Sequence, residues 1–182
     1  MQIDRQGWLI GVNHTLSPNY DQRPHGAVID LLVIHNISLP PGEFGGSWIS
    51  ALFTNSLDCA AHPYFEQLRD VKVSAHILIR RDGEMIQYVS FNDRAWHAGV
   101  SNFQGRERCN DFSIGIELEG EDRVPYTDDQ YRILDNVTRV IMQAYPAITT
   151  DRITGHSDIA PNRKTDPGPA FDWQRYLEKL KR

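Results

Sequence analysis

The segment "AVIDLLVI", residues 27–34, constrains the fold most, because it is a short apolar run rich in β-branched residues. Such a run predicts a strand buried on both faces, as in sheets covered by helices on each side. The runs "VSAHILI", "FSIGIELEG" and "RITGH" predict further strands, and the last of them ends at His156. Asp82-Gly83 indicates a tight hairpin that returns through the strand "MIQYVS".

Helical patterns separate these strands. Thr127 and Gln130 form a capping box, which predicts the start of a helix. The apolar residues of that helix recur at helical spacing, at Tyr131, Leu134, Val137, Ile141 and Ala144. Strands separated by helices predict an α/β fold, a single domain with a central mixed β-sheet flanked by helices.

Shorter helices are expected on either side of this pattern. Ser47 is expected to cap one whose buried side carries Ile49, Leu52 and Phe53. Pro63 is expected to open another, and "FDWQRYLEKLK" predicts a C-terminal helix. Residues 1–182 are expected to form one domain, with the polar and irregular residues 1–26 as an arm that wraps around it.

Composition excludes some classes of function. The 182 residues are 40% apolar and 24% charged, as in an ordinary soluble domain with a real core. The net charge of −5 argues against a general nucleic-acid binder. No apolar stretch approaches the ~20 residues that cross a membrane. The first residues lack a basic region leading into an apolar one, so a cytoplasmic protein is expected, with Cys59 and Cys109 as free thiols.

The stretch "GHSDIAPNRKTDPGPAFDW", residues 155–173, concentrates ionisable groups on a backbone stiffened by proline. His156 in this stretch and His35 each end a predicted strand, and a catalytic zinc site needs three protein ligands plus an open position. Asp166 precedes a proline and is expected to be extended, so that Lys164 and Asp166 point the same way. This set suits metal-assisted hydrolysis, with the cation stabilising developing negative charge.

Each of these residues could instead have an ordinary structural role, without metal binding or catalysis. A single histidine at a strand end is more often packed or exposed than a ligand, and the spacing of the three residues is by itself a weak signal. His14, His25 and His62 lie in polar segments and are assigned to the surface. In "FSIGIELEG", alternation puts Glu117 and Glu119 on the same face, so either could be a catalytic base or a solvated carboxylate.

Four blocks then reveal a resemblance: "VIHNISLPPGEFGG", "SAHILIRRDGE", "RAWHAGVSNFQGRERCNDFSIGIELEG" and "TGHSDIAPNRKTDPGPAFDW". Together they closely resemble the N-acetylmuramoyl-L-alanine amidase type 2 family, from about residue 7 to residue 176. The resemblance implies helices around a central mixed sheet. It also implies one zinc ion per chain, held by His35, His156 and Asp166, with Glu117 as the base and Lys164 as the oxyanion stabiliser.

Many members of the wider family have cysteine in place of Asp166 and tyrosine in place of Glu117. This sequence is instead similar to the cytoplasmic branch that acts on 1,6-anhydro-muropeptides. An oxygen ligand is a normal zinc donor, and a carboxylate is a more plausible base at neutral pH than a phenol of pKa ~10.

The resemblance further implies the substrate and its contacts. The substrate would be an imported anhydro-muropeptide, in which the lactyl group of 1,6-anhydro-N-acetylmuramic acid is joined by an amide to L-alanine. Amide hydrolysis by a monomer, in cytoplasmic cell-wall recycling, would follow. The implied substrate-binding residues are Asn36, Lys72, Ala95, Trp96 and Arg108.

For some residues that the resemblance implicates, a different contact or a structural role remains possible. Lys72 stands where close relatives have arginine, which predicts one point charge in place of a bidentate pair. Trp96 is equally compatible with an ordinary core position. His76 and His97 recur in the family's motifs and are expected to support or line the cleft without binding metal, although a purely buried role fits as well.

Two other functions are weighed against the amidase. A module that binds muropeptides without cutting them would not need all five of the metal-binding and catalytic positions, which are filled here. A hydrolase with Cys59 or Cys109 as nucleophile has no supporting spacing. The segment 39–69 is expected to be a mobile flap beside the metal, because it is rich in proline and glycine near its start.

Overall fold

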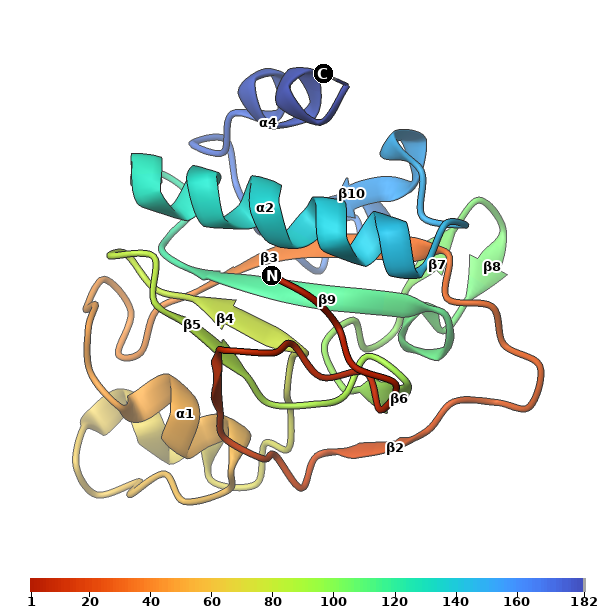
Figure 1. The fold of residues 1–182 in the computed structure, drawn as a ribbon. Coiled ribbons are helices and arrows are strands. Elements are labelled where there is room, and N and C mark those ends of the chain that lie inside the picture. Colours follow the sequence, from red (N-terminus) through yellow and green to blue (C-terminus); the bar gives the residue numbers. More distant parts are fainter. Residues whose placement is uncertain (182) are drawn as a thin grey trace.

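The computed structural model describes residues 1–181 and has a six-stranded mixed sheet at its centre (Figure 1). The strands lie in the order β1-β5-β4-β9-β3-β10. Their bounds are Asn13–His14 (β1), Leu31–Ile37 (β3), Ile77–Ile79 (β4), Met85–Gln87 (β5), Ser113–Glu119 (β9) and Ile153–Gly155 (β10). Neighbouring strands are parallel except β4 and β5, which form the predicted hairpin. The predicted α/β fold around a mixed sheet is therefore confirmed.

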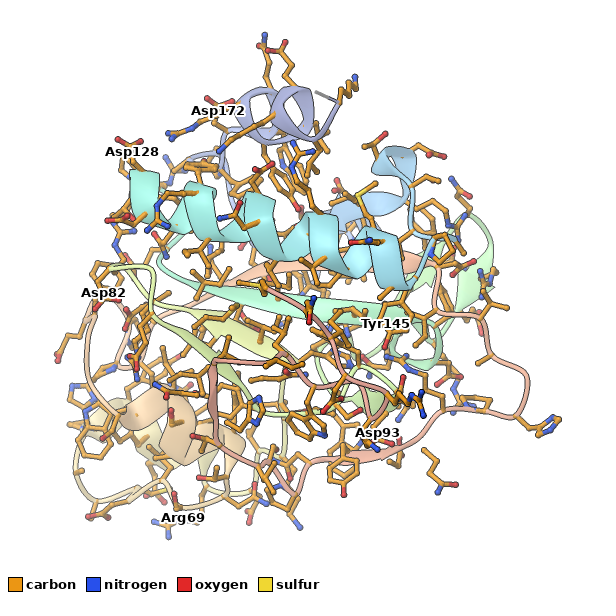
Figure 2. The ribbon with its side chains drawn as sticks, in the orientation of Figure 1. Arg69, Asp82, Asp93, Asp128, Tyr145 and Asp172 are labelled. Carbon is orange, nitrogen blue, oxygen red and sulfur yellow. The ribbon has the colours of Figure 1, made fainter. Side chains whose placement is uncertain are left out.

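Helices cover both faces of this sheet. Their bounds are Trp48–Phe53 (α1), Asp128–Ala144 (α2), His156–Ile159 (α3) and Trp173–Leu180 (α4). In Figure 1, α2 lies over one face with α4 outside it, and α1 lies on the opposite side. Figure 2 shows apolar and aromatic side chains filling the space between α2 and the sheet, and Asp128 and Asp172 at the starts of α2 and α4. Each face of the sheet therefore has its own hydrophobic core.

Short elements complete the fold. Two small antiparallel sheets pair β2 (Tyr20–Gln22) with β6 (Asp93–Ala95), and β7 (Asn102–Phe103) with β8 (Arg106–Glu107). Three 3₁₀ helices are η1 (Pro63–Leu68), η2 (Cys109–Asp111) and η3 (Thr150–Arg152). Within residues 1–181, no helix combines the length and the apolar character that crossing a membrane requires.

The N-terminal residues run along the domain surface and pair with it twice, through β1 at the sheet edge and through β2 (Figure 1). Arg23 anchors the end of this arm. Its guanidinium donates to the backbone carbonyls of Phe91, Asn110, Asp111 and Ser113 at 2.8–3.3 Å. The arm is thus fastened to the segments that flank β9.

The boundaries predicted for the strand at residues 27–34 are wrong. β3 begins at Leu31, because Asp30 before it pairs with Arg106 and Arg152 at 2.6 and 2.8 Å. The strand then continues past His35 to Ile37, because β9 pairs with it over all seven residues. His35 consequently lies inside a strand, not at its end.

Details of the helix predictions also differ. The capping box of Thr127 and Gln130 is present, with both hydrogen bonds formed. Ser47 precedes α1, but its backbone is helical (φ −89°, ψ −1°), so its side chain makes no capping hydrogen bond. Ala144 is exposed at the last position of α2, whereas the other four apolar residues predicted for its inner face are buried.

Candidate active site

Three side chains from distant parts of the sequence converge beside the carboxyl ends of β3 and β10. His35 comes from β3, His156 begins α3 directly after β10, and Asp166 lies in the following loop. The two histidine Nδ1 atoms lie 3.0 Å apart, and the Asp166 Oδ2 atom lies 3.0 and 3.1 Å from them. All three residues are buried, and their donor atoms could hold one metal ion.

The geometry of this donor triangle is compatible with zinc. Zinc binds imidazole nitrogen and carboxylate oxygen at about 2.0–2.1 Å in tetrahedral sites, which separates neighbouring donor atoms by roughly 3.3 Å. The observed edges of 3.0–3.1 Å are slightly shorter. The triangle thus has the size and the donor types of a three-ligand metal site.

Charge supports the same interpretation. Burial lowers the pKa of His35 to about 4, against the opposing effect of Asp166, so this imidazole is neutral at pH 7. Burial alone would raise the pKa of Asp166, but its close contacts with His156 and His35 outweigh burial and hold that pKa well below its usual value. A neutral imidazole at His35 and an ionised carboxylate at Asp166 are protonation states that metal binding requires.

Each histidine is also held by its outer nitrogen. The Nε2 atom of His156 lies 3.1 Å from the carbonyl oxygen of Ala98, to which it can donate. The Nε2 atom of His35 lies 2.9 Å from Nδ1 of His97. These contacts leave both Nδ1 atoms free to face the centre of the triangle.

Glu117 lies next to the triangle because of strand register. It pairs directly with His35 across the parallel strands β3 and β9. Among the residues described, its Oε2 atom is buried without a hydrogen-bond partner. Burial, and then the negative charge of Asp166, raise the pKa of Glu117 well above its ordinary value, with Lys164 acting in the opposite sense. An orphaned carboxylate oxygen of raised pKa beside a metal triad is what a general base requires.

One cavity of about 260 Å³ joins these groups. Its lining includes His97, Glu117, His156, Lys164 and Asp166. Lys164 is otherwise exposed and Asp166 is buried, and both residues line the same cavity.

Glu119 does not share this environment. Its Oε1 atom accepts a hydrogen bond from the backbone of Gly45 at 2.6 Å and pairs with Arg80 at 3.4 Å. Its Oε2 atom accepts from the backbone of Arg81 at 3.1 Å. The structure therefore separates two carboxylates that alternation left equivalent.

The five residues implied in substrate binding are not all at this cavity. Asn36 and Trp96 line it, and the indole Nε1 atom of Trp96 is buried without a partner among the described residues. Lys72 lines a neighbouring cavity of about 70 Å³. Ala95 is fully buried in β6, and Arg108 lies in a separate groove of about 470 Å³.

Several supporting contacts gave no recognisable signal in the sequence. Tyr126 donates from its hydroxyl to the carbonyl oxygen of Pro167 at 2.8 Å, and Asn36 donates to the same oxygen at 3.1 Å. Arg163 donates to the carbonyl oxygen of Ala98 at 2.6 Å. Their contacts are with backbone carbonyls distant in sequence, which no local pattern reveals.

The sequence and the fold agree with comparisons to known proteins. The model of the family described as N-acetylmuramoyl-L-alanine amidase matches residues 25–169. The 1,6-anhydro-N-acetylmuramyl-L-alanine amidase AmpD of Escherichia coli (strain K12) is 64% identical over 171 residues, 94% of this chain and 93% of AmpD.

Solved structures extend the agreement. A crystal structure of a selenomethionine derivative of AmpD is 60% identical, with a TM-score of 0.96 over 99% of both chains. The E. coli amidase AmiD, solved with the substrate anhydro-N-acetylmuramic acid-L-Ala-D-gamma-Glu-L-Lys, is 31% identical with a TM-score of 0.61. That match covers 87% of this chain and 60% of AmiD. This chain therefore belongs to the N-acetylmuramoyl-L-alanine amidase type 2 family of hydrolases.

Proposed function

We propose that this chain is a zinc-dependent amidase of cytoplasmic cell-wall recycling. It hydrolyses the amide between the lactyl group of 1,6-anhydro-N-acetylmuramic acid and L-alanine. The observation that carries the proposal is the cluster of His35, His156 and Asp166 beside Glu117, with His156, Asp166 and Glu117 lining one cavity. The 64% identity to a 1,6-anhydro-N-acetylmuramyl-L-alanine amidase supports the substrate. Residues 1–182 would act as one domain and as a monomer.

Zinc would be held by Nδ1 of both histidines and by the carboxylate of Asp166, one ion per chain. When bound there, zinc supplies Lewis acidity, which lowers the pKa of water and polarises a carbonyl group. The donor triangle and the neutral state of His35 support this role for the three residues.

Glu117 and Lys164 would carry the proton and the charge of the reaction. The Glu117 carboxylate takes a proton from the attacking water and delivers it to the nitrogen of the departing L-alanine. Its raised pKa suits a group that must both accept and return a proton near neutral pH. The Lys164 ammonium stabilises the negative charge that develops on the attacked carbonyl oxygen.

The substrate would lie across the cavity and its neighbouring surfaces. Asn36 and Trp96 would contact the bicyclic sugar, since both line the cavity and the Trp96 indole has a free donor. Ala95 precedes Trp96 and would contribute through its backbone. Lys72 would meet the carboxylates of the peptide stem from the neighbouring cavity, and Arg108 would meet them from its separate groove.

The test is kcat/KM on three matched substrates: an anhydro-muropeptide, the same muropeptide with a reducing-end sugar, and intact cell wall. A reducing sugar adds hydroxyl groups, and each polar group left unpaired in a closed site costs ~1–3 kcal/mol. We expect release of free peptide from the anhydro substrate, with at least a tenfold preference over the reducing one. Equal rates on the two soluble substrates would contradict the sugar contacts, and faster digestion of intact wall would contradict the recycling role.

A further inference from the structure

The dipeptide His97–Ala98 contacts both histidines of the metal triad from outside. The His97 ring meets His35, with its Nδ1 atom 2.9 Å from His35 Nε2. The Ala98 carbonyl oxygen lies 3.1 Å from His156 Nε2. Both members of the dipeptide are buried. Two adjacent residues therefore meet two ligands that are 121 positions apart in the sequence.

This dipeptide is itself anchored. The backbone N–H groups of His97 and Ala98 both donate to Oδ1 of Asn110, at 3.2 and 2.8 Å. Asn110 is buried next to the start of β9. One amide oxygen thus fixes the backbone of both residues.

Gly115 of β9 provides the space for the His97 ring. A Cβ atom at position 115 would lie 2.5 Å from the Cγ and Nδ1 atoms of His97, closer than non-bonded atoms approach. The ring therefore packs directly against the strand that carries Glu117. Any larger residue at position 115 would clash with this ring.

The hydrogen-bonding capacity of imidazole assigns the protons. A neutral histidine that offers Nδ1 to a metal carries its proton on Nε2, so His35 and His156 must each donate from Nε2. His97 must then accept at Nδ1 and carry its own proton on Nε2. Ser113 Oγ lies 3.1 Å from His97 Nε2 and can accept that proton.

We infer that His97 is a positioning residue for the metal site. Its ring supplies the acceptor that His35 needs when Nδ1 binds metal, and Asn110 holds this ring and the Ala98 carbonyl in place together. The inference rests on the proposed zinc site. It goes beyond that proposal by assigning a role to a histidine and an asparagine that are not among the metal ligands.

His76 offers a matched control within the same buried layer. Its ring lies 5.7 Å from the His97 ring, centroid to centroid. It accepts from the backbone of Gly115 at Nδ1 and faces the Asp93 carbonyl with Nε2, so it contacts neither histidine ligand. Loss of His76 should cost stability in a similar way, but it should not remove a partner of His35.

The experiment measures zinc affinity by competition with a chromophoric chelator, in the full-length wild-type chain and in four variants. His97→Leu removes the acceptor, and we expect zinc binding ~10–100-fold weaker, the usual effect of losing such a partner. His97→Asn puts an amide oxygen near the position of Nδ1, so we expect a loss of less than about fivefold. Asn110→Ala keeps the ring but releases its backbone, and we expect an intermediate loss. His76→Leu should leave zinc affinity within about twofold of wild type.

A spectroscopic readout tests the proton assignment directly. Long-range ¹H–¹⁵N correlation spectra of the zinc-loaded wild-type protein should place the His97 proton on Nε2 and leave Nδ1 unprotonated. A His97 proton on Nδ1 would overturn the inference. So would wild-type zinc affinity in His97→Leu, or an equal loss of affinity in His76→Leu. A wild-type chain that binds no zinc would instead overturn the proposed function itself.

Discussion

Glu117 and Glu119 lie on the same face of one strand, yet their surroundings give them different roles. Both carboxylate oxygens of Glu119 have partners: the backbone N–H groups of Gly45 and Arg81 and the side chain of Arg80. Glu117 has a buried oxygen without a partner in residues 1–181 and a raised pKa. Glu119 therefore holds neighbouring loops together. The Glu117 carboxylate is instead buried beside the proposed metal ligands without full hydrogen bonding, which costs stability.

Two isosteric substitutions should separate these roles. Glu117→Gln should lower kcat by ~10²–10⁴-fold, the usual contribution of a general base. It should also leave the melting temperature unchanged or raised, because an ionised carboxylate of raised pKa destabilises the folded state at pH 7. Glu119→Gln should lower the melting temperature and reduce kcat less than tenfold. Activity assays and thermal unfolding on the same samples check both, and a larger loss of kcat in Glu119→Gln would reverse the assignment.

His76 makes stability depend on pH. Burial, followed by the charge of Arg23, lowers its pKa from 6.5 to about 3 despite a hydrogen bond to the Asp93 carbonyl. Between these values the unfolded chain binds a proton that the folded chain does not. The stabilising contribution is therefore complete above pH 6.5 and is lost as the pH falls toward 3, at about 1.4 kcal/mol per pH unit.

Urea unfolding at pH 4.5, 5.5 and 7.5 measures this effect. The free energy of unfolding should fall less steeply with acid in His76→Gln than in the wild-type protein, because the variant has no group to protonate there. His14→Gln provides the control, since His14 is exposed. Identical acid slopes in His76→Gln and wild type would contradict the buried, neutral state of His76.

The loop that carries Asp166 is held by elements far from it in sequence. Tyr126, before α2, and Asn36, in β3, both donate to the carbonyl oxygen of Pro167. Gly168 then packs against Asp122, where a Cβ atom would lie 2.2 Å from the Asp122 Cα atom. Asp166, a proposed metal ligand in a proline-rich loop, is thus positioned by the sheet and by the loop after β9.

Tyr126→Phe should loosen this loop without changing its shape. Loss of one buried hydrogen bond should cost about 1 kcal/mol of stability, and the freer Asp166 should weaken zinc binding several-fold. Tyr145→Phe is the matched control, because its hydroxyl bonds the side chain of Asn92 at the surface near the end of α2 (Figure 2). Equal zinc affinity in both variants would mean that the Tyr126 hydroxyl does not position Asp166.

The segment 39–69 remains a prediction of a mobile flap. It contributes Leu39, Leu52 and Tyr64 to the wall of the cavity, and its apolar residues pack against β4 and β5. Its helices are short, however, with six residues each in α1 and η1. We expect amide hydrogens of 39–69 to exchange faster than those of β9. Uniformly slow exchange across the segment, matching the sheet, would contradict the prediction.

Sequence patterns predicted the elements better than their ends. The capping box at Thr127 has a local cause, so it was predictable, as was the hairpin at Asp82-Gly83. The start of β3 was not, because the side chain of Asp30, just before the strand, pairs with arginines at positions 106 and 152. Long-range ion pairs of this kind leave no periodic signal.

At the scale of the whole molecule, the order and direction of the strands bring the residues of the site together. The parallel register of β3 and β9 sets His35 opposite Glu117, and β10 beside β3 brings His156 to the same edge. Their spacing along the chain could suggest these residues as candidates, but it could not show that they lie close together in space. The family resemblance supplied that step, whereas the supports at Asn110, Tyr126 and Ser113 required three-dimensional contacts.

The dependence of the amidase reaction on zinc tests the account most directly. The measurement is zinc content by elemental analysis together with peptide release from an anhydro-muropeptide, before and after chelation and after zinc is restored. We predict one zinc per chain, loss of activity on chelation and recovery with zinc. We also predict loss of bound zinc in Asp166→Ala, but retained zinc with lost turnover in Lys164→Ala. Full activity in a thoroughly metal-depleted sample would contradict the account.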